Sequence, residues 1–491
     1  MHWSIGRLAR MWIVRSMCAG AVISPVVLAA VADSDLRLVT AAAQQDRATV
    51  RALLKQGVDV NVARADGATA LLYAAHWDDL ETVDLLLRAR ANPNVADDHG
   101  VTPLARACEN VSIGVVERLL KAGANPNAAQ TSGLTPLMIA AKTGSVRVVR
   151  ALLAGGAHVN AATVDTKNTA LMWAIAGRQT DVVRALIEAQ ADVHASTANG
   201  LTPLLIAARN GDIEMAKTLI AAGVDVNGTG TEAVHALPFS IVTGQAGFAL
   251  FMLEQGADPN GAMAGVRALH AAVASVRPWL TEWSQKYGAA ARIRDVTPAE
   301  RRALVKALLA RGADPDSRIA NTAVFEPWLA YPRKGAFESY SCGTGDLRGA
   351  TPLWLVSHAA NGIGGRVYNG VDAPDRGDGV SETNRMNVEF IRTLLAAGAD
   401  PRLVTDDGTT PLMVAAGLGR CSNERMLKRG TRLPAAEEAV KLLLDAGADV
   451  NAVNEADFTA LHGAAYRGLN EVIQILVEHG ANINARDYRG R

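Results

Sequence analysis

The chain has 491 residues, of which 49% are apolar and 20% are charged, so it can bury a sizeable core and is not disordered throughout. Lysine plus arginine and aspartate plus glutamate both number 49, which gives a net charge of zero. A general binder of nucleic acid or of anionic membranes needs a basic excess, and the composition disfavours both classes.

The first predicted element is a targeting segment. Three arginines precede an apolar stretch over 17–32, which ends in Ala30-Val31-Ala32 before Asp33. This order is typical of a secretory signal peptide, so we predict cleavage after Ala32 and export to the periplasm or the medium. The alternative is an uncleaved membrane anchor, but the apolar stretch is shorter than the roughly 20 residues that a spanning helix needs.

From residue 35 onward a repeat organises the chain. Equivalent turn positions fall at Asn61, Asn94, Asn127, Asn160, His194, Asn227, Asn260, Asp316, Arg402, Asn451 and Asn484. The marks are 33 or 34 residues apart as far as Asn260 and mostly farther apart beyond it. A second series, Thr-Pro-Leu or Thr-Ala-Leu, precedes most of these marks by 25 residues. A fixed period of this length indicates stacked repeats rather than separate domains.

Each part of the repeat predicts a local structure. Threonine before proline or alanine caps a short first helix, and paired leucines mark a second helix. A glycine then ends the second helix in a left-handed cap at Gly57, Gly123, Gly156, Gly223, Gly256, Gly312, Gly398, Gly447 and Gly480. Arg90 and Gln190 interrupt this series, and we expect weaker helix ends there. A D/N-x-N turn and a further glycine form the hairpin into the next repeat.

These motifs resemble those of the ankyrin-repeat family, whose period and G-x-TPLH-x-A pattern they follow over about residues 35–491. The resemblance implies an all-α solenoid of helix pairs with projecting hairpins, here eleven repeats. We assign 33–261 to regular repeats 1–7, 262–453 to repeats 8–10 with insertions, and 454–491 to repeat 11 and the start of a twelfth that we expect to continue beyond residue 491. Only His270 and His462 keep the family's histidine after the leucine, which predicts fewer hydrogen bonds between repeats.

Insertions enlarge the eighth, ninth and tenth repeats. They fall between 270 and 304, at 318–348, at 361–384 and at 418–433, and repeat arrays accept such insertions in loops, often on the binding face. Within the first of them, Trp279, Trp283 and Tyr287 have the spacing of one helix face. This stripe predicts a partner-binding site, because such residues dominate interface hot spots. The alternative is that the rings dock the insertions onto the solenoid.

Motifs for catalysis are missing from the sequence. It contains no phosphate-binding loop, HExxH, CxxC or G-x-S-x-G motif, and its histidines lack metal-ligand spacing. We therefore expect no enzyme activity, no cofactor and no metal. Within 361–384, Asp372, Asp375 and Glu382 are slightly similar to an acidic calcium loop, but their spacing does not match, and ion binding there stays open.

The four cysteines have different expected fates. Cys18 leaves with the signal peptide, and Cys108 occupies a small-residue position of a first helix, where we expect a buried thiol. Cys342 and Cys421 lie in insertions of adjacent repeats, so a disulfide between them is open in an oxidising compartment.

In the ankyrin family the recognition surface comprises the hairpin tips and the exposed face of the first helices. The resemblance maps this surface onto Asp66, His76, Trp77, His99, Glu109, Asn110, Lys142, Thr143, Arg209, Asn210, Tyr466 and Arg467. Trp77 is the strongest candidate, because a large ring at an exposed repeat position has no role in the core. The alternative is that this ring packs on the neighbouring first helix.

The sequence therefore predicts an exported protein-protein interaction module, a scaffold or an inhibitor, monomeric and typical of bacteria. We expect a protein partner, no nucleic acid, and no membrane once the signal peptide is removed. Two alternatives stay open. One is the regulatory arm of a larger enzyme or transporter that continues beyond residue 491, and the other is a secreted effector.

Overall fold

The structure is a computed structural model, and it describes residues 36–230, 233–274, 296–320, 348–361, 382–418, 432–487 and 490. In this part of the chain it contains 22 α-helices and one short two-stranded sheet, so the predicted all-α repeat fold is confirmed. None of the helices within these ranges has both the length and the apolar character needed to cross a bilayer. The chain divides into two compact units, Met1–Asn125 and Pro126–Arg491.

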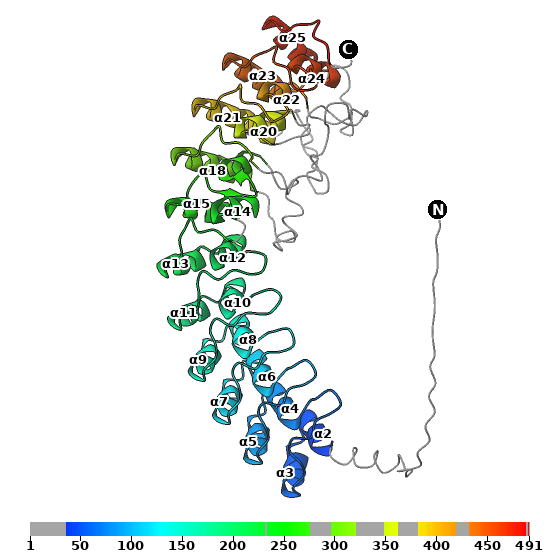
Figure 1. Cartoon of the computed structure of the whole chain (residues 1–491), viewed down its shortest axis with the longest axis vertical. Helices are drawn as coiled ribbons and strands as arrows, with labels where there is room; N and C mark the ends of the chain where they lie inside the picture. Colours follow the sequence, from blue (N-terminus) through cyan, green and yellow to red (C-terminus); the bar gives the residue numbers. More distant parts are fainter. Residues whose placement is uncertain are drawn as a thin grey trace, which may run out of the picture. The chain divides into compact units, whose positions relative to one another are not determined.

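The first unit contains three consecutive helix pairs. They are α2 (Arg37–Ala43) with α3 (Arg47–Lys55), α4 (Ala70–His76) with α5 (Leu80–Arg88), and α6 (Pro103–Glu109) with α7 (Ile113–Lys121). First helices pack on first helices, and second helices pack on second helices. Figure 1 shows these two rows in blue and cyan, with the hairpin loops projecting from the side of the first helices.

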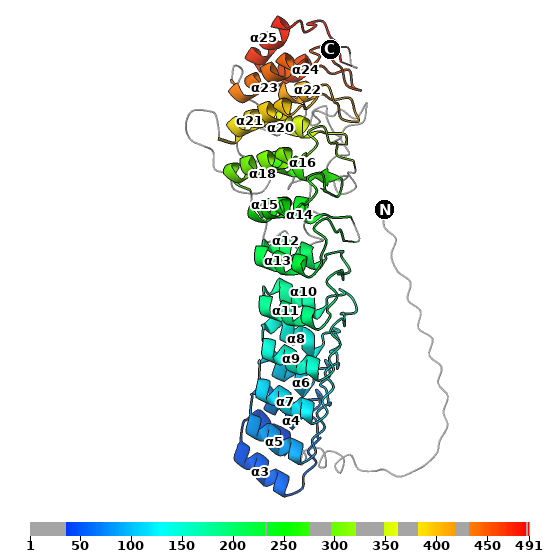
Figure 2. The same cartoon turned by 90° about the vertical axis from the view of Figure 1, so that its left-hand side faces the viewer.

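The second unit opens with four regular pairs. They are α8 (Pro136–Thr143) with α9 (Val146–Ala154), α10 (Ala170–Ala176) with α11 (Thr180–Glu188), α12 (Pro203–Asn210) with α13 (Ile213–Ala221), and α14 (Ala236–Val242) with α15 (Ala246–Glu254). Figure 2 shows from a second side that each pair stacks on the next one along the chain.

Four further pairs complete the second unit. They are α16 (Ala268–Val273) with α18 (Pro298–Ala310), α20 (Pro352–Ala360) with α21 (Glu382–Ala396), α22 (Pro411–Ala415) with α23 (Pro434–Asp445), and α24 (Ala460–Arg467) with α25 (Asn470–Glu478). Strands β1 (Ala262–Met263) and β2 (Val266–Arg267) form an antiparallel hairpin ahead of α16. The helix pairs of the described chain number eleven, which agrees with the eleven predicted repeats.

One predicted insertion is shorter than expected at its C-terminal end. Helix α21 begins at Glu382, inside the segment 361–384 that the sequence assigns to a loop. The Glu382 carboxylate lies in the first helical turn, where the helix dipole favours a negative charge. It also accepts from Arg302 of α18 at 3.3 Å. The ion pair gives Glu382 a partner other than a metal ion.

The repeat motif forms the local structures that its residues predict. Thr69 caps α4 by accepting a hydrogen bond from the Leu72 amide at 3.3 Å, and Thr135 caps α8 in the same way with proline at the first helical position. In the paired leucines of the second helices, the first member is buried and the second is half-buried, as at Leu86 and Leu87. One face of each second helix therefore supplies the core.

The asparagine at each turn mark also links neighbouring repeats. The amide of Asn127 donates to the carbonyl of Gly156 at 3.0 Å, and its Oδ1 accepts from the backbone N–H of His158 at 2.7 Å. The same two bonds recur at Asn94, Asn160, Asn227, Asn260 and Asn451. The sequence predicts only a turn at these positions, whereas the structure gives each side chain two bonds to the following repeat.

The helix ends keep their geometry where glycine is missing. Arg90 and Gln190 both have a φ of 65°, in the left-handed region that glycine occupies at the equivalent positions. The backbone N–H of Ala91, which follows Arg90, still donates to the carbonyl of Leu86 at 3.0 Å. A residue with a side chain in this conformation costs about 1–2 kcal/mol of folding free energy. Arg90 and Gln190 therefore strain the backbone locally without altering the fold.

Candidate protein-binding surface

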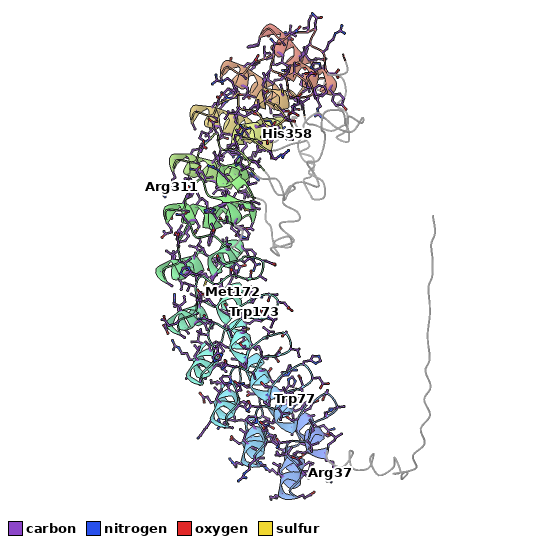
Figure 3. The ribbon with its side chains drawn as sticks, in the orientation of Figure 1. Arg37, Trp77, Met172, Trp173, Arg311 and His358 are labelled. Carbon is purple, nitrogen blue, oxygen red and sulfur yellow. The ribbon has the colours of Figure 1, made fainter. Side chains whose placement is uncertain are left out.

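Within each compact unit, the predicted surface residues that the structure describes lie on the side of the helix pairs from which the hairpins project. We call this side the hairpin face and define it as the hairpins together with the exposed residues of the first helices. Figure 3 shows Trp77 on this side at the end of α4, and Trp173 on α10. Most of the candidates described by the structure are exposed or half-buried here, so the hairpin face presents side chains rather than enclosing a cavity.

Trp77 combines the two roles that the sequence leaves open. Its indole N–H donates to the carbonyl of Ala43 in the preceding repeat at 3.1 Å. Its ring meets His76 edge-on, with centroids 4.6 Å apart. The side chain nevertheless stays 45% exposed. The neighbouring repeat therefore holds the ring in place, and a large part of the aromatic surface faces solvent.

Two other candidates hold the fold together. The amide of Asn110 donates to the carbonyl of His76, one repeat earlier. Likewise the side-chain amide of Asn210 donates to the carbonyl of Ile175 at 3.4 Å. In the following repeat, the side-chain amide of Gln245 donates to the carbonyl of Arg209. These bonds join the ends of successive first helices. Sequence reasoning placed Asn110 and Asn210 at the surface and missed that their side chains bridge repeats.

The remaining candidates of the first unit have local partners. Glu109 accepts from Arg106 at 2.8 Å, one turn earlier in α6. Asp66 accepts from the backbone N–H of Ala68 at 3.0 Å and shapes the hairpin. His99 is exposed in the next hairpin. Their side chains stay on the surface.

In the last repeat, the two candidates differ. Tyr466 is 59% exposed, and Arg467 is half-buried. The stem of Arg467 lies against Gly417, where an added Cβ would come within 2.7 Å of the arginine Cγ. Arg467 therefore contributes packing between repeats as well as surface charge.

Several predictions concern residues outside the described part of the chain. These are the signal peptide over 1–32, the aromatic stripe Trp279, Trp283 and Tyr287, the pair Cys342 and Cys421, and the acidic residues Asp372 and Asp375. A described aromatic next to the insertions, Trp354, is buried, and its N–H donates to Thr409 of the next repeat at 3.2 Å. That ring packs between repeats.

One aromatic site was missed by the sequence analysis. Lys142 at the end of α8 places its ammonium 5.3 Å from the ring centroid of Trp173, which lies on α10. The hydroxyl of the adjacent Thr143 donates to the carbonyl of Ala140 at 2.9 Å. The available signal was positional, because Trp173 lies four residues after Thr169, and Tyr73 occupies the same place after Thr69, beneath Arg64.

Buried titratable groups lie away from the hairpin face. Cys108 is buried in α6, which confirms the predicted buried thiol, and burial raises the pKa of that thiol. His270 is fully buried in α16, and desolvation lowers its pKa to about 4. Within the described residues, no three His, Cys, Asp or Glu side chains gather in a group that could hold a metal ion.

Stacked helix pairs with projecting hairpins, present in each of the two units, define a repeat protein that presents a surface to a partner. The family model described as ankyrin repeats, in three copies, matches residues 38–130, 111–197, 189–263 and 381–487. The matches cover more than half of the chain, and the chain belongs to the ankyrin-repeat family. As a member of this family, it is a protein-protein interaction module.

Similar proteins match this chain over short segments. A probable E3 ubiquitin-protein ligase of Oryza sativa subsp. japonica, XBOS34, is 35% identical over 103 residues, which are 21% of this chain and 17% of that protein. Human ankyrin repeat and SOCS box protein 16 is 36% identical over 107 residues, 22% of this chain and 20% of that protein. The Neurogenic locus Notch protein of Drosophila melanogaster is 34% identical over 144 residues, 29% of this chain and 4% of that protein. The chain thus spans about a fifth or less of each relative.

Proposed function

We propose that this chain is an exported scaffold or inhibitor that binds a protein partner through its hairpin face. The observation that carries the proposal is Trp77, because a hydrogen bond to Ala43 fixes its indole while 45% of the side chain stays exposed. A large aromatic ring held rigidly at the surface contributes contact area at little cost in conformational entropy. Such a ring suits a recognition site.

The experiment is crosslinked capture of partners by the exported chain. Trp77→Ala is compared with Val477→Ala, which removes an exposed apolar side chain from second helix α25. Loss of an aromatic hot spot weakens binding by about 2 kcal/mol or more, so Trp77→Ala should bind the partner roughly thirtyfold more weakly and capture correspondingly less of it. Val477→Ala should match the wild type. Equal capture by Trp77→Ala, with unchanged melting, would refute a role of Trp77 in recognition.

Export is part of the same proposal and rests on the basic, apolar and small-residue segments ahead of Asp33. The expected mature N-terminus is Asp33. Mass spectrometry of the protein recovered from its host decides the matter. Chains that keep Met1 and fractionate with membranes would contradict export by a cleaved signal.

A further inference from the structure

We propose that the hairpin face of the fourth to sixth repeats binds an acidic, extended segment of a partner protein. This inference rests on the proposed function, because it names the chemistry of the partner for one part of the hairpin face. It concerns helices α8, α10 and α12 and their hairpins, all within the second compact unit. The four basic side chains Lys142, Lys167, Arg178 and Arg209 form what we call the basic patch.

Charge is distributed unevenly over the hairpin face. In the hairpins and first helices over 128–144, 161–179 and 195–211, the basic patch supplies four positive charges, and Asp165 is the single acidic residue. The equivalent segments of the second and third repeats, 62–78 and 95–111, carry the acidic residues Asp66, Asp78, Asp97, Asp98 and Glu109 against Arg64 and Arg106. Although the whole chain has a net charge of zero, the hairpin face of the fourth to sixth repeats is basic and complements an acidic ligand.

The basic side chains are connected across three first helices. Lys142 of α8 lies over the ring of Trp173 on α10, at 5.3 Å from its centroid. Arg178, just after α10, donates to the carbonyl of Asn210 at the end of α12. These two contacts join α8 to α10 and α10 to α12, so the patch is continuous along the stack.

Three charges of the patch stay available for a ligand. Lys142, Lys167 and Arg178 form no ion pair with a carboxylate among the described residues. By contrast, two arginines on the second helices of the same repeats are paired, Arg150 with Glu188 at 3.6 Å and Arg184 with Asp181 at 3.3 Å. The charges of Lys142, Lys167 and Arg178 are thus left to face an incoming anion.

Apolar surface accompanies the charge. Val164, next to the tip of the hairpin that leads into α10, is 79% exposed. The indole N–H of Trp173 is buried without an acceptor in the described structure. A buried, unpaired N–H costs about 1–3 kcal/mol, so Trp173 is not optimised for stability. An acidic segment with apolar side chains matches both features, because carboxylates pair with the cations and apolar groups cover Val164 and the ring of Trp173.

A protein segment fits this surface better than a nucleic acid. Typical nucleic-acid sites neutralise about six to ten phosphates, whereas the patch offers four cations with Asp165 among them. Trp173 is half-buried and Lys142 lies over its ring, so a stacking base would have to displace the lysine.

The test measures binding of a fluorescein-labelled peptide, made of glutamates around a central pair of leucines, to the whole mature chain by fluorescence anisotropy. The variant Lys142→Glu/Arg178→Glu inverts two charges of the patch. The control Arg147→Glu/Arg184→Glu inverts two charges on α9 and α11 of the same repeats. We expect the patch variant to bind at least about tenfold more weakly and the control to stay within about twofold of the wild type. Affinity should fall with added salt.

Three results would overturn the inference: no binding of the peptide at low salt, equal weakening in both double variants, or tighter binding of labelled single-stranded DNA than of the peptide. Circular dichroism melting of each variant ensures that only folded protein is compared. Failure here is distinguishable from failure of the proposed function. If the chain captures a partner in a Trp77-dependent manner but ignores the acidic peptide, the function stands and this inference fails.

Discussion

Interfaces between regular repeats differ from interfaces beside the insertions in the side chain at one repeat position. After the leucine of the first helix, the regular repeats place buried apolar side chains such as Met138 and Met172. The eighth and ninth repeats place His270 and Trp354 there, and both bond to the following repeat. Inserted residues lengthen the connection between repeats, so the connection alone does not set how the next repeat packs. A buried polar side chain must find particular carbonyl partners, and this requirement sets the packing register. At this buried position, polar bridges therefore occur where the chain connection specifies the register least.

His270 makes the most extensive of these bridges. Its Nδ1 accepts from the Arg267 amide at 3.2 Å. Its Nε2 lies 3.0 Å from the carbonyl of Ser317 and 3.2 Å from that of Ala350. With Nδ1 as acceptor, Nε2 carries the proton and donates to both carbonyls. One side chain thus links α16 to residues on both sides of the insertion over 318–348.

The largest expected effect comes from removing this bridge. His270→Ala removes the partner of the Arg267 amide and of the Ser317 carbonyl, and one of the two bonds of the Ala350 carbonyl. It also leaves a cavity, so it should lower the free energy of unfolding by about 3–5 kcal/mol. His462→Ala is the matched control, because His462 is half-buried and bonds to Thr459 in its own repeat. Urea unfolding followed by circular dichroism should show a much smaller loss for the control. Equal losses would contradict a special role for the buried bridge.

Acid should break the same interface. Burial lowers the pKa of His270 to about 4 from the ordinary 6.5. The unfolded chain therefore binds a proton between these two values while the folded chain does not. The stabilising contribution is complete above pH 6.5 and falls as the pH drops toward 4, by up to about 3 kcal/mol. His270→Gln cannot titrate and should lose this part of the pH dependence. An unchanged profile would show that other groups cause it.

A regular interface should be weakened less. Asn127→Ala removes two bonds to the next repeat, those with Gly156 and His158. Because the site is exposed and water replaces the lost partners, we expect a loss of about 1–2 kcal/mol. His194→Ala, at the equivalent mark two repeats further along the chain, should change stability by less than about 0.5 kcal/mol. Thermal melting of both variants checks the comparison. If Asn127→Ala does not change the stability, the asparagine bonds do not stabilise the interface between repeats.

The smallest effect is a gain in stability. Arg90 has a φ of 65° and is exposed, so Arg90→Gly relieves the backbone strain and should raise the free energy of unfolding by about 1 kcal/mol. The reciprocal change Gly123→Ala, in open space at a φ of 86°, should lower it by a similar amount. If Arg90→Gly is destabilising, the arginine side chain contributes more than its backbone costs.

The sequence predicts those features that depend on residues close together in the chain. Thr69 caps a helix that begins at the next residue, and the buried member of each leucine pair follows from helical periodicity. His270, by contrast, finds its carbonyl partners 47 and 80 residues away. Trp173 meets a lysine of the preceding repeat. Such contacts follow from the stacking of particular repeats, and no local pattern reports them.

The central claim is that the hairpin face binds the partner. Hydrogen–deuterium exchange of the whole mature chain, with and without its captured partner, tests it most directly. The account predicts slower exchange in the hairpins and the ends of the first helices from α4 to α12 when the partner is bound. Protection confined to the insertions near 275–295, 321–347 and 362–381, with the hairpins unchanged, would contradict it.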